Sequence, residues 1–362
     1  MNTIDVKLST QSYQIRIGTG LIEQAGVLLR QSGLIGEKAV IITDTTVGGL
    51  YSKRLQEGLD SGGCKSTVLE VPEGEGQKSL ESAGKLYHEL TRQYVDRTTP
   101  ILALGGGVIG DLAGFVAATY MRGVPLVQVP TTVLAQGDSS IGGKVAINNG
   151  NIKNIIGTFY HPRITISDVS TLRTLSNRIV IDGLSEVIKH SIILDGRLFT
   201  FLEQNIDNVM NFNMDVLENI ISRSARIKAS IVEKDELDLG IRNILNFGHT
   251  VGHAVESASN MKVWHGEAVA IGMIAEARIS NKLNILPGID LKRIQSLVEK
   301  AGLPVVIPSL DMASLVNIMK HDKKRALGKL KMALPKSIGE AVIVDNVDLE
   351  LIKEVLKRNE KP

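Results

Sequence analysis

The two halves of this 362-residue chain differ in the spacing of their apolar residues. Up to about residue 175, short β-rich runs such as KAVIIT (38–43) and PILAL (100–104) alternate with helical segments. Apolar strands separated by helices predict a mainly parallel sheet with helices on both faces. Later in the chain the apolar residues follow helical spacing, as in VIDGLSEVIKHSIIL (180–194), and a strand-like run returns only at EAVIVD (340–345).

This change of pattern predicts both the fold class and the domain boundary. We expect an α/β N-terminal domain with a mainly parallel nucleotide-binding sheet over residues 1–175 and an all-α C-terminal domain over residues 176–362. A chain of 362 residues is long for one hydrophobic core, so two domains are the expected arrangement. A composition of 43% hydrophobic, 22% charged and 4% aromatic residues excludes a disordered chain and is typical of a globular protein.

Charge and cysteine usage exclude several classes of protein. The 41 Lys and Arg residues against 39 Asp and Glu residues give a formal charge of +2 without a basic block, so nucleic acid is not an expected partner. The single cysteine, Cys64, excludes an intramolecular disulfide and suits a reducing cytoplasm. The N-terminal residues lack a signal-peptide pattern, and the most apolar run (101–118) is interrupted by three consecutive glycines and Asp111. We therefore expect a cytoplasmic protein with no membrane partner.

A glycine-rich turn, GGGVIGD (105–111), follows the strand PILAL and opens a helix. Its first, third and sixth residues have the spacing of a dinucleotide-binding turn, in which glycines let the backbone approach a pyrophosphate at the helix N-terminus. Such turns also occur for packing alone, and this one lies well after the first strand. Asp44, directly after KAVIIT, is placed to hold a ribose hydroxyl, although it could instead cap the helix that follows.

The stretch PTTVLAQGDSSIGGKVAINNGNIKNIIGTFYHP (130–162) combines small, polar and cationic residues with interleaved apolar ones. Lys144 and Lys153 in such surroundings suggest an anionic ligand. The alternative for either lysine is an ordinary surface charge, which is the commoner case.

A second cationic candidate is found in the helical segment DGLSEVIKHSI (182–192). Glu186 and Lys189 are three residues apart, so they lie on one helix face. They could form a surface ion pair of little consequence. Apolar neighbours on both sides make a half-buried, functional pair an equally good interpretation.

Three of the seven histidines fall within NFGHTVGHAVESASNMKVWHGEAVA (246–270). His249 and His253 are four residues apart, like the histidines of a zinc-protease helix, but that motif needs a glutamate after the first histidine and Thr250 stands there. His265 opens another apolar helix, and any one of the three could be a capping or core residue. Together with Glu186 they could supply two histidines and one carboxylate for a metal and a further histidine as a base, which leaves an open coordination position for substrate.

The chain resembles the 3-dehydroquinate synthases, members of the sugar phosphate cyclase family, over nearly its whole length. The resemblance implies an N-terminal NAD-binding α/β domain, a C-terminal α-helical metal- and substrate-binding domain, and a homodimer. The motifs that carry it occur in this order: PEGEGQK, GGGVIGD, YMRG, PTTVLAQGDSSIGGK, KNIIG, SEVIKH, RNILNFGHTVGHAVE, WHGEAVAIGM and HDKKRALGK.

The resemblance also assigns roles to residues. Glu186, His249 and His265 would bind a divalent metal, Zn²⁺ or Co²⁺, and His253 would act in proton transfer near the leaving phosphate. The other implied catalytic residues are Asp138, Lys144, Lys189 and Asn246. Implied substrate contacts are Asn154, Lys228, Arg242, one lysine of the pair Lys323–Lys324 (we favour Lys324), and Arg122, which would reach the phosphate in the neighbouring subunit. Implied NAD contacts are Asp44, Glu75, Lys78, Gly106, Gly107, Val108, Asp111, Thr131, Thr132, Lys153, Thr171, Leu172, Arg173 and Thr174.

The implied reaction converts the sugar phosphate 3-deoxy-D-arabino-heptulosonate 7-phosphate to 3-dehydroquinate and phosphate in the shikimate pathway. It would proceed by transient oxidation by NAD, β-elimination of phosphate, re-reduction and intramolecular aldol closure. The segment NNGNI (148–152) departs from the His-Pro-Leu-Gly of many members, and we expect an altered loop with retained activity.

Three alternatives remain. A sister cyclase acting on a sugar phosphate without a carboxylate would have no need of Arg242 and Asn246. A metal-dependent polyol dehydrogenase, of the glycerol type, would lack SEVIKH and KVAIN and would accumulate NADH. A degenerate sugar-phosphate-binding protein would require the loss of a metal or base residue, and all four are present.

Overall fold

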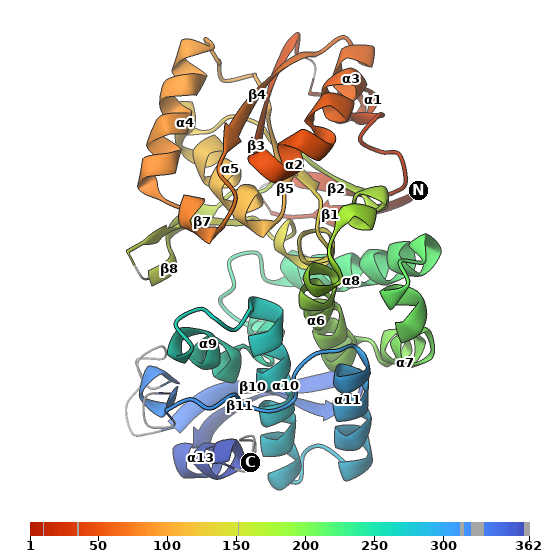
Figure 1. The fold of residues 1–362 in the computed structure, drawn as a ribbon, viewed down its shortest axis with the longest axis vertical. Helices are drawn as coiled ribbons and strands as arrows, with labels where there is room; N and C mark the ends of the chain where they lie inside the picture. Colours follow the sequence, from red (N-terminus) through yellow and green to blue (C-terminus); the bar gives the residue numbers. More distant parts are fainter. Residues whose placement is uncertain (10, 35, 151, 312–314, 320–328, 358–362) are drawn as a thin grey trace. The chain divides into compact units, whose positions relative to one another are not determined.

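The computed structural model describes residues 1–362 except residues 10, 35, 151, 312–314, 320–328 and 358–362 (Figure 1). The chain forms two compact units, each described by itself below. The first contains Met1–Leu175 and Leu217–Leu237, and the second contains Ser176–Val216 and Asp238–Pro362. Our predicted division placed residues 217–237 in the C-terminal domain, whereas the structure packs them with the N-terminal unit.

The first unit contains a seven-stranded sheet in the order β1-β2-β9-β6-β5-β3-β4. Only β1 runs antiparallel to its neighbour, so the predicted mainly parallel sheet is confirmed. The strands are β1 (Asn2–Lys7), β2 (Ser12–Gly18), β3 (Lys38–Asp44), β4 (Lys65–Val71), β5 (Ile101–Gly105), β6 (Leu126–Pro130) and β9 (Ile164–Asp168).

Helices cover both faces of this sheet because successive side chains of a buried strand point to opposite sides. In β3, Val40 and Ile42 join one core cluster with α4 and α5, while Ala39 and Ile41 join another with α1 and α3. The helical elements before residue 175 are α1 (Ala25–Gln31), α2 (Thr45–Val47), η1 (Gly48–Ser52), α3 (Lys53–Ser61), η2 (Glu75–Gln77), α4 (Leu80–Arg92), α5 (Gly107–Thr119), η3 (Tyr120–Arg122), η4 (Ala135–Ser139) and η5 (Val169–Thr174).

Two further elements complete the first unit. The strands β7 (Lys144–Asn149) and β8 (Ile152–Phe159) form an antiparallel hairpin, and Gly150 after β7 has a φ of 57°. Helix α8 (Met214–Lys234) lies along the β1–β2 edge, where Glu233 Oε1 accepts the backbone N–H of Lys7 at 2.7 Å. These contacts explain why residues 217–237 belong to this unit.

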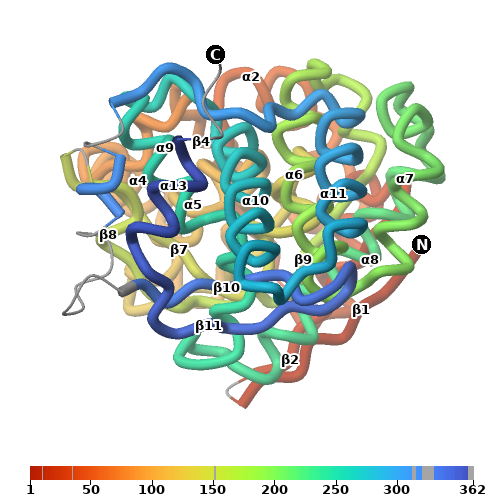
Figure 2. The backbone as a smooth tube through the Cα atoms, turned by 90° about the horizontal axis from the view of Figure 1, so that it is seen from below, coloured from red at the N-terminus to blue at the C-terminus, as the bar shows by residue number. Residues whose placement is uncertain are grey.

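The second unit is helical, as predicted, with one antiparallel hairpin that the all-α expectation did not include. Helix α10 is its centre and packs against α6, α9, α11, α13 and the strand β10 (Figure 2). Its elements are α6 (Asn177–Leu194), α7 (Gly196–Met210), η6 (Ile241–Asn246), α9 (His249–Ala258), α10 (His265–Lys282), α11 (Gly288–Lys300), β10 (Lys329–Ser337), β11 (Glu340–Asp348) and α13 (Leu349–Lys357). The run EAVIVD is part of β11, and its partner β10 was missed because Pro335 interrupts its strand pattern.

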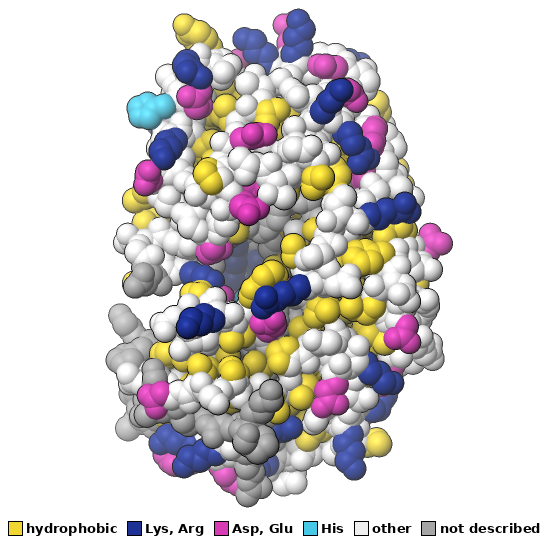
Figure 3. All heavy atoms as spheres, in the orientation of Figure 1, with side chains coloured by type: hydrophobic (Ala, Val, Ile, Leu, Met, Phe, Trp, Pro, Cys, Tyr) yellow, Lys and Arg dark blue, Asp and Glu magenta, His cyan; other side chains and the backbone are white. Residues whose placement is uncertain are grey.

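The helices and the surface agree with the composition. Among the described residues, no helix combines the length and apolarity needed to cross a bilayer. On the face drawn in Figure 3, basic and acidic side chains are interspersed among apolar and uncharged ones, in line with a net charge of +2.

Candidate active site

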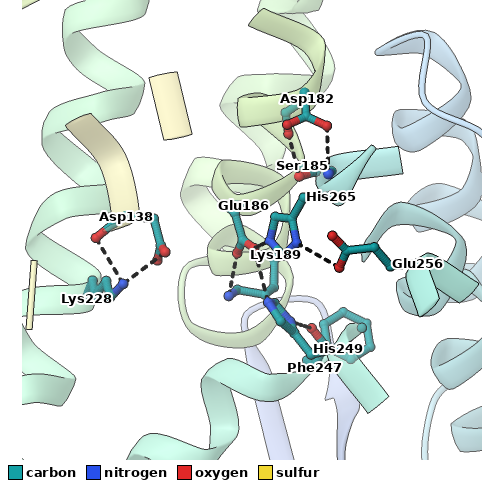
Figure 4. Close-up of polar contacts among 12 residues, drawn as sticks. Asp138, Asp182, Ser185, Glu186, Lys189, Lys228, Phe247, His249, Glu256 and His265 are labelled. Carbon is teal, nitrogen blue, oxygen red and sulfur yellow. Dashed lines mark hydrogen bonds and ion pairs between the residues drawn. The ribbon is translucent and has the colours of Figure 1, made fainter. Parts of the chain in front are cut away.

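Three helices of the second unit bring a carboxylate and two histidines together. Glu186 lies within α6, and His249 and His265 are the first residues of α9 and α10. The Oε1 atom of Glu186 is 3.2 Å from Nε2 of His249 and 3.3 Å from Nε2 of His265 (Figure 4). One ligand atom from each residue lies within 4.8 Å of the others. The structure therefore gathers the three residues predicted to bind a metal.

Local sequence places each histidine at the start of its helix. Gly248, at a φ of 81°, ends the preceding turn, so that α9 begins at His249. Before α10, the backbone N–H of Trp264 donates to Glu267 Oε2 at 3.1 Å, and the Arg178 guanidinium lies 4.1 Å over the Trp264 ring. Both histidine side chains are therefore held by defined helix starts.

The second nitrogen of each ring also has an acceptor beside it. Nδ1 of His249 is 3.2 Å from the Phe247 carbonyl oxygen, and Nδ1 of His265 is 3.7 Å from Glu256 Oε2. An acceptor at Nδ1 holds the proton there and leaves Nε2 for a metal. Two imidazole nitrogens and one carboxylate oxygen, with such outer partners, fit Zn²⁺ or Co²⁺ with a position left open.

The electrostatics of the cluster favour the metal-binding protonation states of Glu186 and His249, whereas His265 must lose a proton when it binds a metal. Burial by itself would raise the pKa of Glu186, but Lys189 and His249 hold it well below its usual range. Burial lowers the pKa of His249, so that ring is neutral at neutral pH. Burial also opposes the charge on His265, yet its hydrogen bonds to Glu186 and Glu256 raise the pKa of His265 to about 10. Glu186 is therefore an anion and His249 a neutral donor, as metal binding requires.

His253 lies beside the cluster without joining its three ligand atoms. Its ring centroid is 5.2 Å from that of His249 and 6.4 Å from that of His265. Desolvation by surrounding atoms, with smaller contributions from those two histidines, lowers the pKa of His253. Its neutral ring can accept or donate a proton, and its assignment to proton transfer stays a prediction.

Of the remaining predicted residues of this unit, those that the structure describes lie on α6 and η6. Lys189 is fully buried and forms an ion pair with Glu186, so the pair is not the surface salt bridge that its spacing also allowed. Arg242 is buried, and Asn246 Nδ2 donates to Asn243 Oδ1 at 3.4 Å. Lys323 and Lys324 lie outside the described residues.

In the first unit, the glycine turn forms the predicted strand–turn–helix. Gly106 is the N-cap of α5, and Gly107 and Val108 are the first two residues of that helix. A Cβ atom on Gly106 would lie 3.3 Å from Thr132 Cγ2, because the segment after β6 passes directly beside the turn. The N–H of Thr131 donates to the Gly105 carbonyl at 3.0 Å. The predicted NAD contacts of these two loops therefore meet at the carboxyl ends of β5 and β6.

A buried lysine links the turn to the β7–β8 hairpin. Lys78 Nζ lies 2.7 Å from Asp111 Oδ2 and 3.8 Å from Glu75 Oε1, and it donates to Asn154 Oδ1. Burial raises the pKa of Asp111, and the Lys78 charge opposes that rise. Asn148 completes the link, since its Oδ1 accepts the Asn154 N–H at 2.9 Å. Predicted cofactor contacts and one predicted substrate contact thus share a single network.

Asp44 and the segment Thr171–Thr174 occupy two other strand ends. Asp44 Oδ1 accepts the N–H groups of Thr46 and Val47 at 3.0 and 2.9 Å, which is the capping role that the sequence also allowed. The residues Thr171, Leu172, Arg173 and Thr174 form η5 directly after β9. Their roles in binding NAD stay predictions.

The predicted anion-binding residues of this unit differ in exposure. Lys228 on α8 pairs with the Asp138 carboxylate at 2.9 Å and donates to its carbonyl oxygen at 2.9 Å (Figure 4). Lys144, Lys153 and Arg122 are exposed. Lys144 lies at the start of β7, Lys153 on β8, and Arg122 in a left-handed backbone conformation at a φ of 66°.

Sequence reasoning missed three acidic side chains that support the cluster. Glu256 on α9 and Glu276 on α10 are buried, and Asp182 on α6 accepts the N–H of Gly266 at 2.7 Å. The available signal was a carboxylate within an otherwise apolar helix face, as in GMIAEARIS (272–280).

Solved structures define the class of enzyme. One similar protein is a 2-deoxy-scyllo-inosose synthase, whose crystal structure is complexed with carbaglucose-6-phosphate, NAD⁺ and Co²⁺. Its sequence is 28% identical to this chain, the match covers 99% of this chain and 100% of that protein's chain, and the TM-score is 0.88. A 2-epi-5-epi-valiolone synthase from Streptomyces hygroscopicus with NAD⁺ and Zn²⁺ bound is 27% identical, with 97% and 98% coverage and a TM-score of 0.87. The fold is thus that of the sugar phosphate cyclases.

Sequence comparison then identifies the family within the sugar phosphate cyclases. Residues 68–182 match the family model of the 3-dehydroquinate synthase N-terminal region, and residues 183–325 match that of its C-terminal region. The 3-dehydroquinate synthase of Desulforamulus reducens is 47% identical over 360 residues, which span 99% of this chain and 100% of that protein. The chain belongs to the 3-dehydroquinate synthase family, as its motifs predicted.

Proposed function

We propose that this chain converts 3-deoxy-D-arabino-heptulosonate 7-phosphate to 3-dehydroquinate and phosphate, with NAD and a divalent metal, in the cytoplasm. The observation that carries the proposal is the cluster of Glu186, His249 and His265 with its outer partners, in a chain 47% identical to a 3-dehydroquinate synthase. Solved structures of its cyclase relatives contain NAD⁺ with Co²⁺ or Zn²⁺. When bound, the metal polarises a substrate hydroxyl and NAD takes up and returns a hydride.

The second unit supplies groups for the charged ends of the substrate and for proton movement. Arg242 presents a buried, planar guanidinium that can hold a carboxylate through two parallel hydrogen bonds. Lys189 keeps Glu186 ionised and offers further N–H donors to a substrate oxygen. His253, neutral at neutral pH, can take or give the proton that accompanies loss of phosphate. Asn246 and Lys324 are proposed as additional substrate contacts.

The first unit supplies the cofactor turn and several cations. The N-terminus of α5 suits a pyrophosphate because its N–H groups and glycines allow close approach. Lys144 is exposed at the start of β7, and a lysine ammonium suits an anionic substrate. The Asp138–Lys228 pair presents a second ammonium in a fixed position. We assign Asn154 to the substrate and the NAD contacts as predicted from the motifs.

We further propose that the active form is a homodimer in which Arg122 reaches the partner's substrate phosphate. Its support is an exposed, apolar strand: Ile152, Ile155 and Phe159 of β8 are 60%, 59% and 36% exposed. A neighbouring subunit would cover such side chains. Mixing Arg122→Ala protein with His249→Ala protein should restore part of the activity, because one of the sites in a mixed dimer is intact. Sedimentation as a monomer at assay concentration would contradict this arrangement.

A phosphate-release assay tests the reaction. With the heptulosonate phosphate and catalytic NAD, the purified protein should release phosphate, and a chelator should stop release until metal is restored. NADH that accumulates in proportion to substrate would contradict the proposal and indicate a polyol dehydrogenase.

A sister cyclase is the second candidate, since its relatives share the fold. The lower identities of 28% and 27%, against 47% for the synthase, favour the synthase. Arg242→Lys should weaken turnover of the carboxylated heptulosonate phosphate, because lysine lacks the planar fork. Equal turnover of a sugar phosphate without a carboxylate would favour the sister activity instead.

A further inference from the structure

Two of the three metal-binding candidates lie at helix ends that are electrostatically unsuited to a cation. His249 and His265 are the first residues of α9 and α10, so the N-termini of both helices lie at the cluster. A helix N-terminus carries unpaired N–H groups and about half a positive charge. Without compensation, these ends would repel a divalent metal.

Neither helix can cap itself with the residue at its N-cap. Gly248 precedes α9 and has no side chain, and Trp264 precedes α10 with an indole N–H that only donates. Side-chain oxygens at the N-cap normally satisfy the first N–H groups of a helix. Glu267 of α10 accepts the Trp264 N–H, but the N–H groups of Gly248 and Gly266, next to the two histidines, are accepted by side chains of other helices.

Glu276 supplies the acceptors for α9. It is fully buried on α10, where its Oε2 accepts the Gly248 N–H at 2.8 Å and its Oε1 accepts the Val251 N–H at 3.1 Å. Each oxygen serves a different amide, on either side of His249. A glutamine could serve only one of them, because its amide NH₂ group would face the other N–H.

Asp182 supplies the acceptor for the start of α10. It lies on α6, one helical turn before Glu186, and its Oδ1 accepts the Gly266 N–H at 2.7 Å (Figure 4). Gly266 directly follows His265. The helix with Glu186 thus caps the helix with His265, which in turn caps the helix with His249 through Glu276.

We propose that Glu276 and Asp182 are positioning residues for the metal: they fix the starts of α9 and α10 relative to Glu186 and neutralise the positive helix ends beside the cation. The proposal rests on the proposed function only through the metal site. A purely structural cap would stabilise its helix without changing metal affinity, and this difference makes the proposal testable.

Metal titration of the chelator-treated protein, without NAD or sugar phosphate, is the decisive experiment. Zn²⁺ affinity would be measured by competition with a chromophoric chelator, and Co²⁺ geometry by its visible absorption. We expect Glu276→Gln and Asp182→Asn each to weaken Zn²⁺ binding by about tenfold or more and to alter the Co²⁺ spectrum, as loss of outer-shell partners does elsewhere.

The matched control is Asp195→Asn. Asp195 caps α7 in the same unit, accepting the N–H groups of Arg197 and Leu198 at 3.0 and 2.9 Å, and α7 carries none of the three ligand residues. Asparagine keeps the Oδ1 acceptor and removes only the charge, so this variant should keep its Zn²⁺ affinity within about twofold. Faster amide exchange at Gly248 and Val251 in Glu276→Gln, with unchanged metal affinity, would overturn the proposal.

Two outcomes separate this inference from the proposed function. If the wild-type protein binds one metal and the variants bind it weakly, while no phosphate is released, the positioning role stands and the reaction is wrong. If circular dichroism shows that Glu276→Gln does not fold, Asp182→Asn is judged by the same criterion, and unchanged Zn²⁺ affinity there overturns the proposal.

Discussion

Replacing Gly272 by alanine should damage the metal site from a distance. Gly272 lies in α10 where it crosses the start of α9, and a Cβ atom there would lie 2.8 Å from the Gly248 carbonyl carbon and from Gly252 N, and closer still to Gly248 O. Ordinary contact is 3.4–4 Å. All three atoms belong to the backbone, so no side-chain rotation can relieve the overlap. The helices must separate, and His249, one residue after Gly248, must move away from Glu186.

The magnitude follows from the kind of overlap. Overpacking in a core costs about 1–3 kcal/mol, and a backbone clash belongs at the upper end. At about 2–4 °C per kcal/mol for a unit of this size, a loss of about 3 kcal/mol lowers Tm by roughly 6–12 °C. Zn²⁺ affinity should fall with it, because the ligand atoms no longer converge.

Calorimetry and Zn²⁺ titration on the same preparation would check this prediction. Gly288→Ala is the matched control in the same unit, since the nearest atom to its Cβ would be Asn281 Nδ2 at 3.8 Å. A Gly272→Ala protein with the Tm and Zn²⁺ affinity of the control would refute the inferred close contact between α9 and α10.

Three further outcomes are expected. His253→Ala should retain its metal through dialysis and lose turnover; loss of the metal would mean that this ring is a ligand. Lys78→Met leaves the Asp111 carboxylate without its ammonium partner, so we expect a loss of about 2 kcal/mol in urea unfolding and weaker NAD binding in a fluorescence titration. An unchanged unfolding free energy and an unchanged NAD affinity would show that the Lys78–Asp111 ion pair contributes to neither stability nor NAD binding. Hydrogen bonds from Thr98 and its neighbour lower the pKa of Asp96 from 3.8 to about 2. A carboxyl group whose pKa is lowered in the folded state stabilises the fold at pH values above its unfolded-state pKa. The difference in unfolding free energy between wild type and Asp96→Asn should therefore be constant above about pH 4 and shrink as the pH falls towards 2. A difference that does not change with pH would contradict this prediction.

Much of the fold could be predicted from the sequence because the strands of the first unit are short, apolar and separated by helices. The strands β3 and β5 fall within a residue of the expected runs KAVIIT and PILAL. The position of α8 could not be predicted this way. Its helical spacing shows that one face is buried, but spacing does not say against which unit.

The candidate site shows the same limit. The residues Glu186, His249 and His265 are found from residue type, spacing and resemblance, and the structure brings them together. Glu276 escapes such reasoning because a single carboxylate in an apolar helix looks like a solvent-facing residue until the neighbouring helix start is known. Residues that act on a helix from another helix require tertiary structure to be recognised.

The return of α8 to the first unit has a consequence for biosynthesis. Because residues 217–237 belong to that unit, the sheet edge at β1 and the Asp138 loop lack their helical partner until the ribosome has made residue 237. Domains generally fold as units during synthesis, N-terminal first. Here the first unit must wait while Ser176–Val216, a part of the second unit, is already outside the ribosome. A truncated chain ending at Leu175 would expose the surface that α8 covers, so the chain must be expressed beyond residue 237 to yield a complete N-terminal unit.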